Sequence, residues 1–232
     1  MLKKATVTDH KYLTDDVVEL TFKVEGNFNY AAGQFTTIRI QDNNPTPCFR
    51  AYSISSAPSS LPGHFQTCLK VVEGGRGSNW LASLNVGDEI NFLGPSGKFL
   101  FTTPKEKTAV FVATGTGITP FLSMINEELN KGSTQKLHLL LGLRHIKNVF
   151  YTEELEKLST EHENFSYNIT LSRPENESWQ GKTGRVTEHL DNLNPETTEI
   201  YICGLKEMID AVIEKLKNLG FKEENIHFEK YD

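Results

Sequence analysis

The spacing of hydrophobic and polar residues changes near residue 104. Before it, short stretches rich in β-branched and aromatic residues are separated by turn residues. After it, apolar runs alternate with segments whose apolar residues recur every three or four positions. The first pattern predicts an antiparallel sandwich or barrel. The second predicts a βαβ order with a parallel sheet.

These patterns predict individual elements. In the first part we expect strands at residues 5–8, 17–24, 35–40, 65–72 and 89–93, and one helix at 79–84. In the second part we expect five strands, at 108–113, 137–142, 165–171, 199–202 and 225–228. The expected helices lie near 119–130, 152–159, 186–192 and 205–219. Residues 101–107 are then the link between two domains.

The run Arg50-Ala51-Tyr52-Ser53-Ile54-Ser55-Ser56-Ala57-Pro58 places a cation, an aromatic ring and a hydroxyl within four residues. In a strand, alternation directs Arg50 and Tyr52 to one face and Ser53 to the other. Arginine offers a planar fork to a pyrophosphate, and tyrosine offers a stacking surface. A partly buried strand that ends at a proline turn explains the same residues, so both interpretations stay open on this run alone.

A second signal is the apolar run Val110-Phe111-Val112-Ala113-Thr114-Gly115-Thr116-Gly117-Ile118-Thr119-Pro120-Phe121-Leu122. It predicts a buried parallel strand, with Thr119 as the N-cap and Pro120 as the first residue of a helix. A strand, a glycine turn and a helix N-terminus together bring backbone amides to a phosphate. The spacing Gly-x-Gly-x-x-Pro departs from the Gly-x-Gly-x-x-Gly dinucleotide fingerprint, so a plain glycine-rich turn remains an alternative.

Two further features lie toward the carboxyl end of the chain. The run Ile200-Tyr201-Ile202-Cys203-Gly204 is an apolar strand that enters a Cys-Gly turn, where open α/β sheets bind ligands. Cys203 is equally well explained as a buried core residue. In the run Ile226-His227-Phe228-Glu229-Lys230-Tyr231-Asp232, a carboxylate and an aromatic ring lie two positions apart.

These four motifs, in this order, resemble the ferredoxin–NADP reductase superfamily of flavoenzymes, and the resemblance covers nearly the whole chain. Family members carry Arg-x-Tyr-Ser, a Gly-x-Gly-[Ile/Leu]-[Ala/Thr]-Pro turn, Cys-Gly and a terminal Glu-x-aromatic sequence. The resemblance implies an antiparallel β-barrel domain that binds FAD, residues 1–103. It also implies an α/β domain with a five-stranded parallel sheet that binds NAD(P), residues 104–232. FMN is the alternative flavin.

The resemblance assigns flavin contacts to the first domain. It implies that Arg50 holds the pyrophosphate, that Tyr52 stacks on the isoalloxazine ring, and that Ser53 hydrogen-bonds near N5, the atom that receives hydride. The glycine-rich run after residue 73 looks like the second phosphate element, with Gly77 admitting a close approach and Ser78 capping a helix. A flexible hairpin turn is the alternative for that run.

In the second domain, the resemblance implies that Gly115, Thr116 and Gly117 face the pyrophosphate of the nicotinamide nucleotide. Arg144 matches a Gly-x-Arg element after the second strand of this domain. An ordinary solvent-facing loop arginine explains Arg144 equally well.

The choice between NADPH and NADH depends on a cluster after the third strand. Short bacterial members of the family use a Ser-Arg and a Gly-Arg for the 2′-phosphate, and the matching residues are Ser172, Arg173 and Arg185. Fixed cations favour NADPH, whereas an NAD-specific site usually places a carboxylate on the ribose hydroxyls. Because Glu175 and Glu177 follow closely, NADH remains the alternative.

The catalytic residues implied by the resemblance are Ser53, Cys203 and Glu229, which would converge around the flavin N5 and the nicotinamide C4. Tyr231 would cover the flavin face that the nicotinamide must reach. One residue departs from the family ending, because Asp232 follows Tyr231. An extra carboxylate beside the flavin would weaken or reposition the stacked ring.

Composition restricts the remaining classes. The 232 residues carry a formal charge of −6, from 24 basic and 30 acidic residues, so no basic footprint suggests nucleic acid. The cysteines, Cys48, Cys68 and Cys203, have neither metal-ligand nor disulfide spacing, so we expect no metal site and a reducing cytoplasm. No apolar segment follows the N-terminal lysines, so no signal peptide is expected. The uncharged stretch 108–126 contains threonines, glycines and a proline, which argues against a membrane span.

The sequence predicts a reductase that takes hydride from NAD(P)H onto FAD. No Cys-x4-Cys-x2-Cys run is present, so we expect electrons to pass to a separate protein, a ferredoxin, a flavodoxin or an oxygenase component. A reductase of free flavin or small acceptors is the rival interpretation. A non-catalytic nucleotide-binding module is less well supported, because binding alone needs none of Ser53, Cys203 and Glu229. We expect a monomer.

Overall fold

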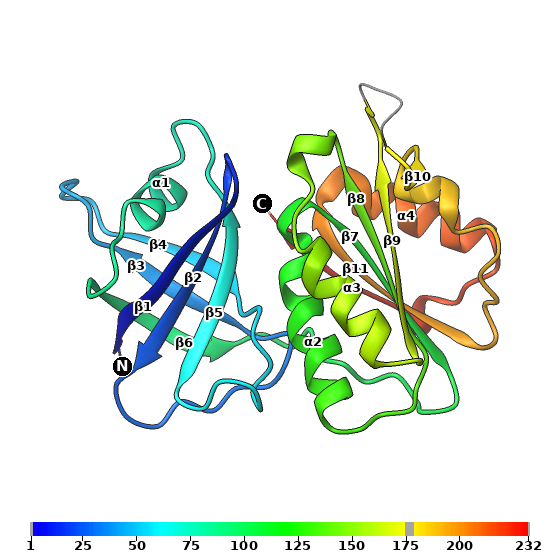
Figure 1. The fold of residues 1–232 in the computed structure, drawn as a ribbon, viewed down its shortest axis with the longest axis horizontal. Coiled ribbons are helices and arrows are strands. Elements are labelled where there is room, and N and C mark those ends of the chain that lie inside the picture. Colours follow the sequence, from blue (N-terminus) through cyan, green and yellow to red (C-terminus); the bar gives the residue numbers. More distant parts are fainter. Residues whose placement is uncertain (1, 175–178, 232) are drawn as a thin grey trace. The chain divides into compact units, whose positions relative to one another are not determined.

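The structure is a computed structural model, and it describes residues 2–174 and 179–231. The chain divides into two compact units (Figure 1). The first comprises Met1–Phe101 with Thr119–Lys131, and the second comprises Thr102–Ile118 with Gly132–Asp232. Helix α2 (Thr119–Asn130), which follows the turn at Gly115 and Gly117, therefore belongs by its contacts to the first unit.

The first unit is a six-stranded antiparallel sheet in the order β4-β3-β6-β1-β2-β5. Its strands are β1 (Lys3–Thr14), β2 (Val17–Val24), β3 (Phe35–Ile40), β4 (Cys48–Ser53), β5 (His64–Lys70) and β6 (Glu89–Ser96). The end strands meet just after β4, where the Ser55 amide donates to the Gln66 carbonyl at 2.9 Å. The Thr67 hydroxyl likewise donates to the Ser53 carbonyl at 2.9 Å. These bonds bring β4 and β5 together, so the sheet curls into the predicted barrel.

Aromatic side chains fill the barrel. The rings of Phe22 and Phe65 stack at 4.9 Å between centroids, and Phe65 lies 5.2 Å from Phe92. All three side chains are fully buried, and each such burial contributes about 1.5–3 kcal/mol. Helix α2 (Thr119–Asn130) packs on the same unit through Phe121, whose ring lies 6.0 Å from that of Phe99.

The second unit is a parallel sheet in the order β10-β9-β8-β7-β11-β12. Its strands are β7 (Thr108–Thr114), β8 (Leu137–Leu143), β9 (Phe165–Leu171), β10 (Lys182–Thr183), β11 (Thr198–Leu205) and β12 (Ile226–Tyr231). The sheet has six strands, so the prediction of five was one too few. The strand that was missed, β10, has two exposed residues, too few to show a hydrophobic pattern.

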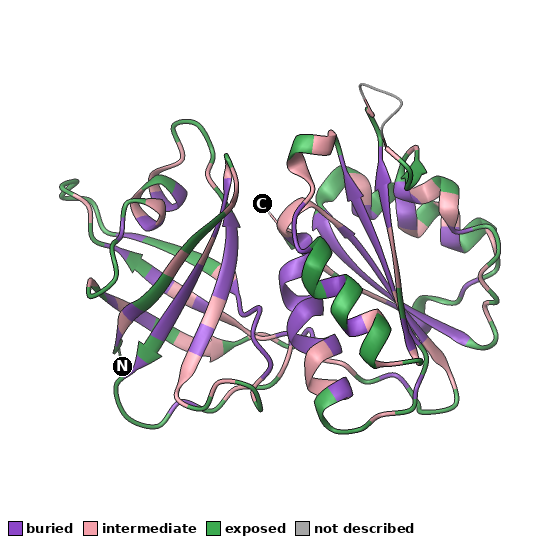
Figure 2. Cartoon of the chain, viewed as in Figure 1, coloured by how far each residue is buried: buried purple, intermediate pink, exposed green. Residues whose placement is uncertain are grey.

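The central strands of this sheet are buried on both faces, as their continuous apolar runs predict (Figure 2). Helices α3 (Thr152–Glu161) and α4 (Lys206–Asn218) lie on opposite faces (Figure 1). Buried side chains of α4 pack with those of β7 and β11 in one core cluster. The carboxyl ends of β7, β8, β9 and β11 therefore form one edge of a rigid sheet, from which the loops project.

Three predicted helix boundaries were wrong. Helix α1 (Arg76–Ala82) begins with Gly75 as its N-cap, so Ser78 lies inside the helix and does not cap it. A 3₁₀ turn, η1 (Gly115–Ile118), precedes α2, so Thr119 is already helical. The helix expected at 186–192 is a four-residue 3₁₀ turn, η3 (Val186–His189).

The uncharged stretch 108–126 forms β7, η1 and the start of α2. Across the described ranges 2–174 and 179–231, no helix combines the length and the apolar character that crossing a bilayer requires.

Candidate functional site

Strand β4 presents the first motif as alternation predicts. Arg50 lies opposite Ile38 and Tyr52 opposite Thr36 in the antiparallel pair with β3. The Arg50 side chain is exposed, and its Nη1 donates to the Phe49 carbonyl at 2.9 Å. Burial raises the pKa of Tyr52 to about 12, so its phenol stays protonated at neutral pH.

Helix α1 approaches this strand at Gly77. A Cβ at Gly77 would lie 2.8 Å from Cγ of Arg50 and 2.8 Å from the Tyr52 hydroxyl oxygen, so only glycine fits without displacement. The hydroxyl of Ser78 accepts from the Val72 amide at 3.1 Å and donates to the Gly75 carbonyl at 3.3 Å. Ser78 thus fixes the glycine-rich loop from inside the helix. The structure brings Arg50, Tyr52 and Gly77 into one cluster.

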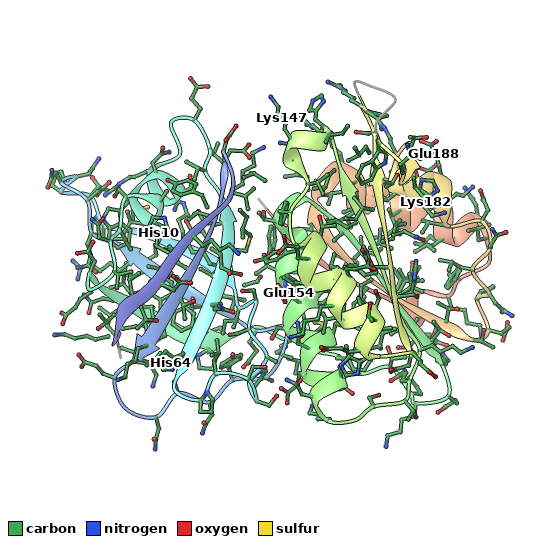
Figure 3. The ribbon with its side chains drawn as sticks, in the orientation of Figure 1. His10, His64, Lys147, Glu154, Lys182 and Glu188 are labelled. Carbon is green, nitrogen blue, oxygen red and sulfur yellow. The ribbon has the colours of Figure 1, made fainter. Side chains whose placement is uncertain are left out.

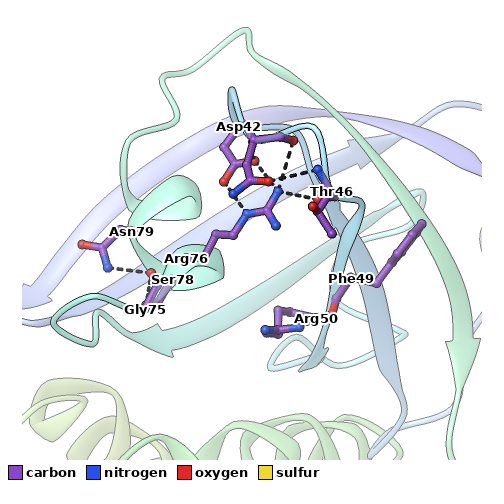
Figure 4. A network of polar contacts seen from close by, with 9 residues as sticks. Asp42, Thr46, Phe49, Arg50, Gly75, Arg76, Ser78 and Asn79 are labelled. Carbon is purple, nitrogen blue, oxygen red and sulfur yellow. Dashed lines mark hydrogen bonds and ion pairs between the residues drawn. The ribbon is translucent and has the colours of Figure 1, made fainter.

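A further residue pair at this cluster was missed by the sequence analysis. Arg76 binds both carboxylate oxygens of Asp42 at 2.6 Å and donates to the Thr46 carbonyl at 2.7 Å (Figure 4). The bidentate contact lowers the pKa of the Asp42 carboxyl. We call Asp42, Thr46 and Arg76 the clasp, because they tie the β3–β4 loop to α1. Asp42 and Arg76 lie 34 positions apart, and nothing in the sequence indicated that they would pair.

In the second unit, the glycine turn packs against β11. Gly115 has a φ of 55°, in the region that favours glycine. A Cβ at Gly117 would lie 2.2 Å from the Cys203 carbonyl oxygen, so the turn and the end of β11 share one tight contact. Thr116, between the two glycines in the sequence, is partly exposed. The predicted phosphate turn and the predicted Cys-Gly turn are therefore adjacent.

The Cys203 side chain meets the last strand. Cys203 is fully buried and lies beside Glu229 in the parallel pair of β11 and β12. Burial, with a smaller effect of the Glu229 charge, raises the pKa of the Cys203 thiol well above its usual value, although a hydrogen bond with Tyr231 opposes the shift. Cys203 is therefore a neutral thiol at physiological pH, unlike a nucleophilic cysteine. Asp232 lies outside the described residues.

Three arginines gather at the carboxyl ends of β8, β9 and β10. The Arg173 amide donates to the Arg144 carbonyl at 2.9 Å, and the Ser172 amide donates to the Leu143 carbonyl at 3.0 Å. Arg185 is the N-cap of η3, two residues after β10. The side chains of Arg144, Ser172, Arg173 and Arg185 are exposed.

Two neighbours of the arginines were not singled out from the sequence. A ring nitrogen of His145 lies 3.1 Å from the Arg173 carbonyl oxygen, and the Glu188 carboxylate accepts from the Arg185 amide at 2.7 Å. Figure 3 shows Glu188 and Lys147 at the same end of this unit. Neither His145 nor Glu188 belongs to a recognisable motif, so the sequence did not indicate these contacts. Glu175 and Glu177 lie outside the described residues.

No three histidine, cysteine or acidic side chains among the described residues come together to hold an ion. The three cysteines are buried.

Two protein families match the chain. The family described as "Oxidoreductase FAD-binding domain" matches residues 4–101, and "Oxidoreductase NAD-binding domain" matches residues 111–214. Ferredoxin--NADP reductase B of Sorangium cellulosum is 36% identical, over 95% of this chain and 93% of that protein. The chain belongs to the ferredoxin–NADP reductase superfamily. It is an NAD(P)H-dependent flavin oxidoreductase.

Other relatives of the superfamily are longer or more distant. The toluate 1,2-dioxygenase electron transfer component of Pseudomonas putida is 29% identical over 98% of this chain and 67% of that longer protein. Among solved structures, a ferredoxin NADP+ reductase from Neisseria gonorrhoeae with bound FAD and NADP superposes with a TM-score of 0.86. That structure is 24% identical and covers 99% of this chain and 98% of its own, which supports the fold.

The residues in the first unit fit the phosphate-bearing part of FAD. Arg50 supplies a cation beside Gly77, where the backbone approaches closely. The first turn of α1 holds no acidic residue, and no side chain caps it, so its amides are suited to an anion.

Proposed function

We propose that this protein oxidises NADPH with a bound FAD and delivers electrons one at a time to a separate protein, a ferredoxin, a flavodoxin or an oxygenase component. FAD, when bound, supplies the step from two-electron hydride acceptance to one-electron release. The relatives support this proposal, because one is a ferredoxin–NADP reductase and another an oxygenase electron transfer component.

The observation that carries the proposal is the packing of the glycine turn on Cys203. A Cβ at Gly117 would meet the Cys203 carbonyl at 2.2 Å, and Cys203 in turn lies beside Glu229. A nucleotide bound at the turn would therefore have a neutral thiol and a carboxylate within the same unit. A module that only bound nucleotide would need neither.

We assign the roles by chemistry. In the first domain, proposed as residues 1–103, Arg50 and the amides around Gly77 and Ser78 would hold the pyrophosphate. Tyr52 would stack on the flavin, and Ser53 would donate near N5. These side chains bind and orient, since none of them needs to change its protonation state.

In the second domain, proposed as residues 104–232, Gly115, Thr116 and Gly117 would hold the nucleotide pyrophosphate. Cys203 would contact the nicotinamide as a neutral, polarisable group, and Glu229 would hold or relay a proton. Tyr231 would restrict the access of the nicotinamide to the flavin ring.

The preference for NADPH is proposed from the arginines. Arg144, Arg173 and Arg185 are exposed at neighbouring strand ends, which suits a dianionic 2′-phosphate. The carboxylate of Glu188, three residues after Arg185, already accepts from the Arg185 amide. An NADH site would require a carboxylate that accepts hydrogen bonds from the ribose hydroxyls. We expect the contact with Arg185 to make the Glu188 carboxylate less available for that role.

The experiment is a measurement of flavin content and turnover on the purified protein. We expect one FAD per chain to remain bound, and NADPH oxidation with ferricyanide as acceptor to exceed NADH oxidation in kcat/KM. A colourless protein that turns over only with added flavin would instead establish the flavin reductase. No turnover with either nucleotide in the presence of flavin would leave a binding module.

A further inference from the structure

The segment that follows Ser53 is held by hydrogen bonds from three other parts of the first unit. The Ser56 carbonyl accepts from the Ser123 hydroxyl at 2.6 Å and from the Tyr30 hydroxyl at 3.2 Å. The Ser56 hydroxyl lies 2.7 Å from the Tyr30 hydroxyl and accepts from the Gln66 amide at 3.0 Å. Burial raises the pKa of Tyr30 to about 12, so that phenol remains a donor at neutral pH. Ser56 is therefore held at both its carbonyl and its hydroxyl.

Ser123 belongs to a row of polar residues on α2. Thr119, Ser123 and Glu127 are four positions apart, so they share one face of the helix. The Thr119 hydroxyl donates to the Cys68 carbonyl at 3.2 Å, and Glu127 accepts from the Ser59 amide at 3.0 Å. Each side chain of this row therefore bonds to backbone of the first unit.

Packing alone does not require this row. Thr119 and Ser123 are both fully buried, and a buried hydroxyl must find a partner to offset its lost hydration. Apolar side chains would hold the helix without that condition. A buried hydroxyl aimed at one carbonyl specifies a position instead.

Chain connectivity adds the second part of the argument. Helix α2 starts directly after η1, the turn that includes Gly115, Thr116 and Gly117. A helix transmits a displacement along its length because its backbone hydrogen bonds resist bending. A nucleotide that orders the turn would therefore act on the start of α2, and Ser123 lies one helical turn further along that helix.

We propose that Ser123 is a positioning residue for the flavin site, and that its bond to Ser56 couples the nucleotide turn to the segment carrying Ser53. The inference rests on the proposed function, since it assumes that the flavin lies along β4. Ser123 itself need not touch FAD or the nucleotide. Its effect reaches the flavin through the backbone of residues 53–56.

The test compares wild type with Ser123→Ala in two measurements. The first is the Kd of FAD for the apoprotein, followed by quenching of flavin fluorescence. We expect Ser123→Ala to raise this Kd about fivefold, as expected for loss of one hydrogen bond. The second is the change in the flavin absorbance spectrum when NADP⁺ saturates the oxidised holoprotein. We expect its amplitude to fall by at least half, which a purely stabilising residue would not cause.

Ser159→Ala is the matched control. Ser159 is also a helical serine, but it is only half-buried and donates to the Glu156 carbonyl of its own helix at 2.9 Å. It should leave both measurements unchanged. If Ser123→Ala does not fold, Ser123→Cys replaces it, because a thiol is a weaker donor to the Ser56 carbonyl, and the same two changes are expected at smaller size.

Two results are decisive in opposite ways. A wild-type FAD affinity together with a full NADP⁺ difference spectrum in the variant overturns the role of Ser123, while the proposed function stands. Failure of the wild-type apoprotein to bind FAD removes the proposed function first. The two failures are therefore distinguishable.

Discussion

Arg50 and Arg76 belong to the same part of the first unit but have different surroundings. Arg76 is bound by Asp42 and by the Thr46 carbonyl, so its donors are engaged within the protein. The guanidinium of Arg50 is exposed, and the hydrogen bond described for it is to the neighbouring Phe49 carbonyl. We infer that Arg50 is the cation offered to a phosphate and that Arg76 builds the loop around it.

The first prediction follows from that difference. Arg50→Ala should raise the Kd of FAD about 10- to 100-fold, because a charge-assisted hydrogen bond is worth about 1.5–3 kcal/mol. Arg39→Ala is the control, since Arg39 is also exposed but lies opposite Phe49, whose side chain points away from that of Arg50. Apoprotein titrated with FAD gives both constants. Equal affinity in the Arg50 variant and wild type would exclude Arg50 from the flavin site.

The second prediction concerns the nucleotide. The double variant Arg173→Ala, Arg185→Ala should raise KM for NADPH by at least tenfold and change KM for NADH little, because NADH lacks the 2′-phosphate. kcat at saturation should stay near wild type, since ground-state binding is lost. Steady-state kinetics with ferricyanide measure KM and kcat for NADPH and for NADH, and NADH serves as the internal control. A wild type that already prefers NADH would contradict the assignment.

At the residue scale, sequence predicted the cluster members better than their contacts. Arg50, Tyr52 and Gly77 were named together, and the structure places them within van der Waals distance. The partnership of Asp42 and Arg76 could not be predicted, because it depends on how the β3–β4 loop folds back on α1. A local sequence pattern does not show which distant residue a loop will contact in the folded protein.

At the scale of elements, several strands and the helices α2 and α3 begin at the predicted residues, whereas α1 begins three residues before the predicted start and the cap assignments were wrong. β2, β3 and β9 have the predicted bounds, because alternation or a continuous apolar run defines a strand along its whole length. Thr119 looked like a cap, yet its hydroxyl donates to the Cys68 carbonyl instead. In a sequence, a capping residue is recognised only by its residue type. In the folded protein, a tertiary contact can use the same hydroxyl instead.

The clasp gives a prediction at this scale. Asp42→Asn should lower the hydrogen-exchange protection of the Asn44 and Thr46 amides, whose acceptors are side chains of the same loop. Because the folded pKa of Asp42 is lowered, the clasp contributes fully above the unfolded pKa of about 3.9. Its contribution is lost as pH falls through the lower, folded value.

Asp210→Asn is the control for the clasp. Asp210 forms an exposed pair with Lys206 one turn away on α4, and such pairs contribute little. Its loss should leave the loop amides unchanged. Protection factors from amide exchange at neutral pH test both variants, and identical protection at Asn44 and Thr46 in Asp42→Asn and wild type would show that Arg76 holds the loop without the carboxylate.

At the scale of the whole molecule, the sequence predicted both sheets and their order along the chain. It did not predict that α2 would pack with the first unit while the turn before it stays in the second. Hydrophobic spacing shows that a helix has an apolar face but does not identify the surface that covers it. The polar row on α2, which bonds to the barrel, is equally invisible in the pattern.

The last prediction concerns electron delivery. The 232 residues contain three cysteines, all of them buried, whereas an iron–sulfur cluster needs four thiolates. Under the proposed function, electrons pass from the flavin to a separate acceptor protein. With cytochrome c as the final reporter, we expect slow reduction by NADPH and enzyme alone. Adding a ferredoxin or flavodoxin should raise the rate at least tenfold and reach saturation, because a protein acceptor binds a surface and a small oxidant does not.

Free FMN at the same concentrations separates the two enzymatic interpretations. A rate that saturates with ferredoxin or flavodoxin and responds weakly to FMN identifies a reductase of protein acceptors. A rate that responds to FMN and not to either protein identifies a flavin reductase. Since ionic strength screens the surface charges that bring two proteins together, the ferredoxin-dependent rate should also fall between low and high salt. The ferricyanide rate without a partner protein controls for any effect of salt on the enzyme itself.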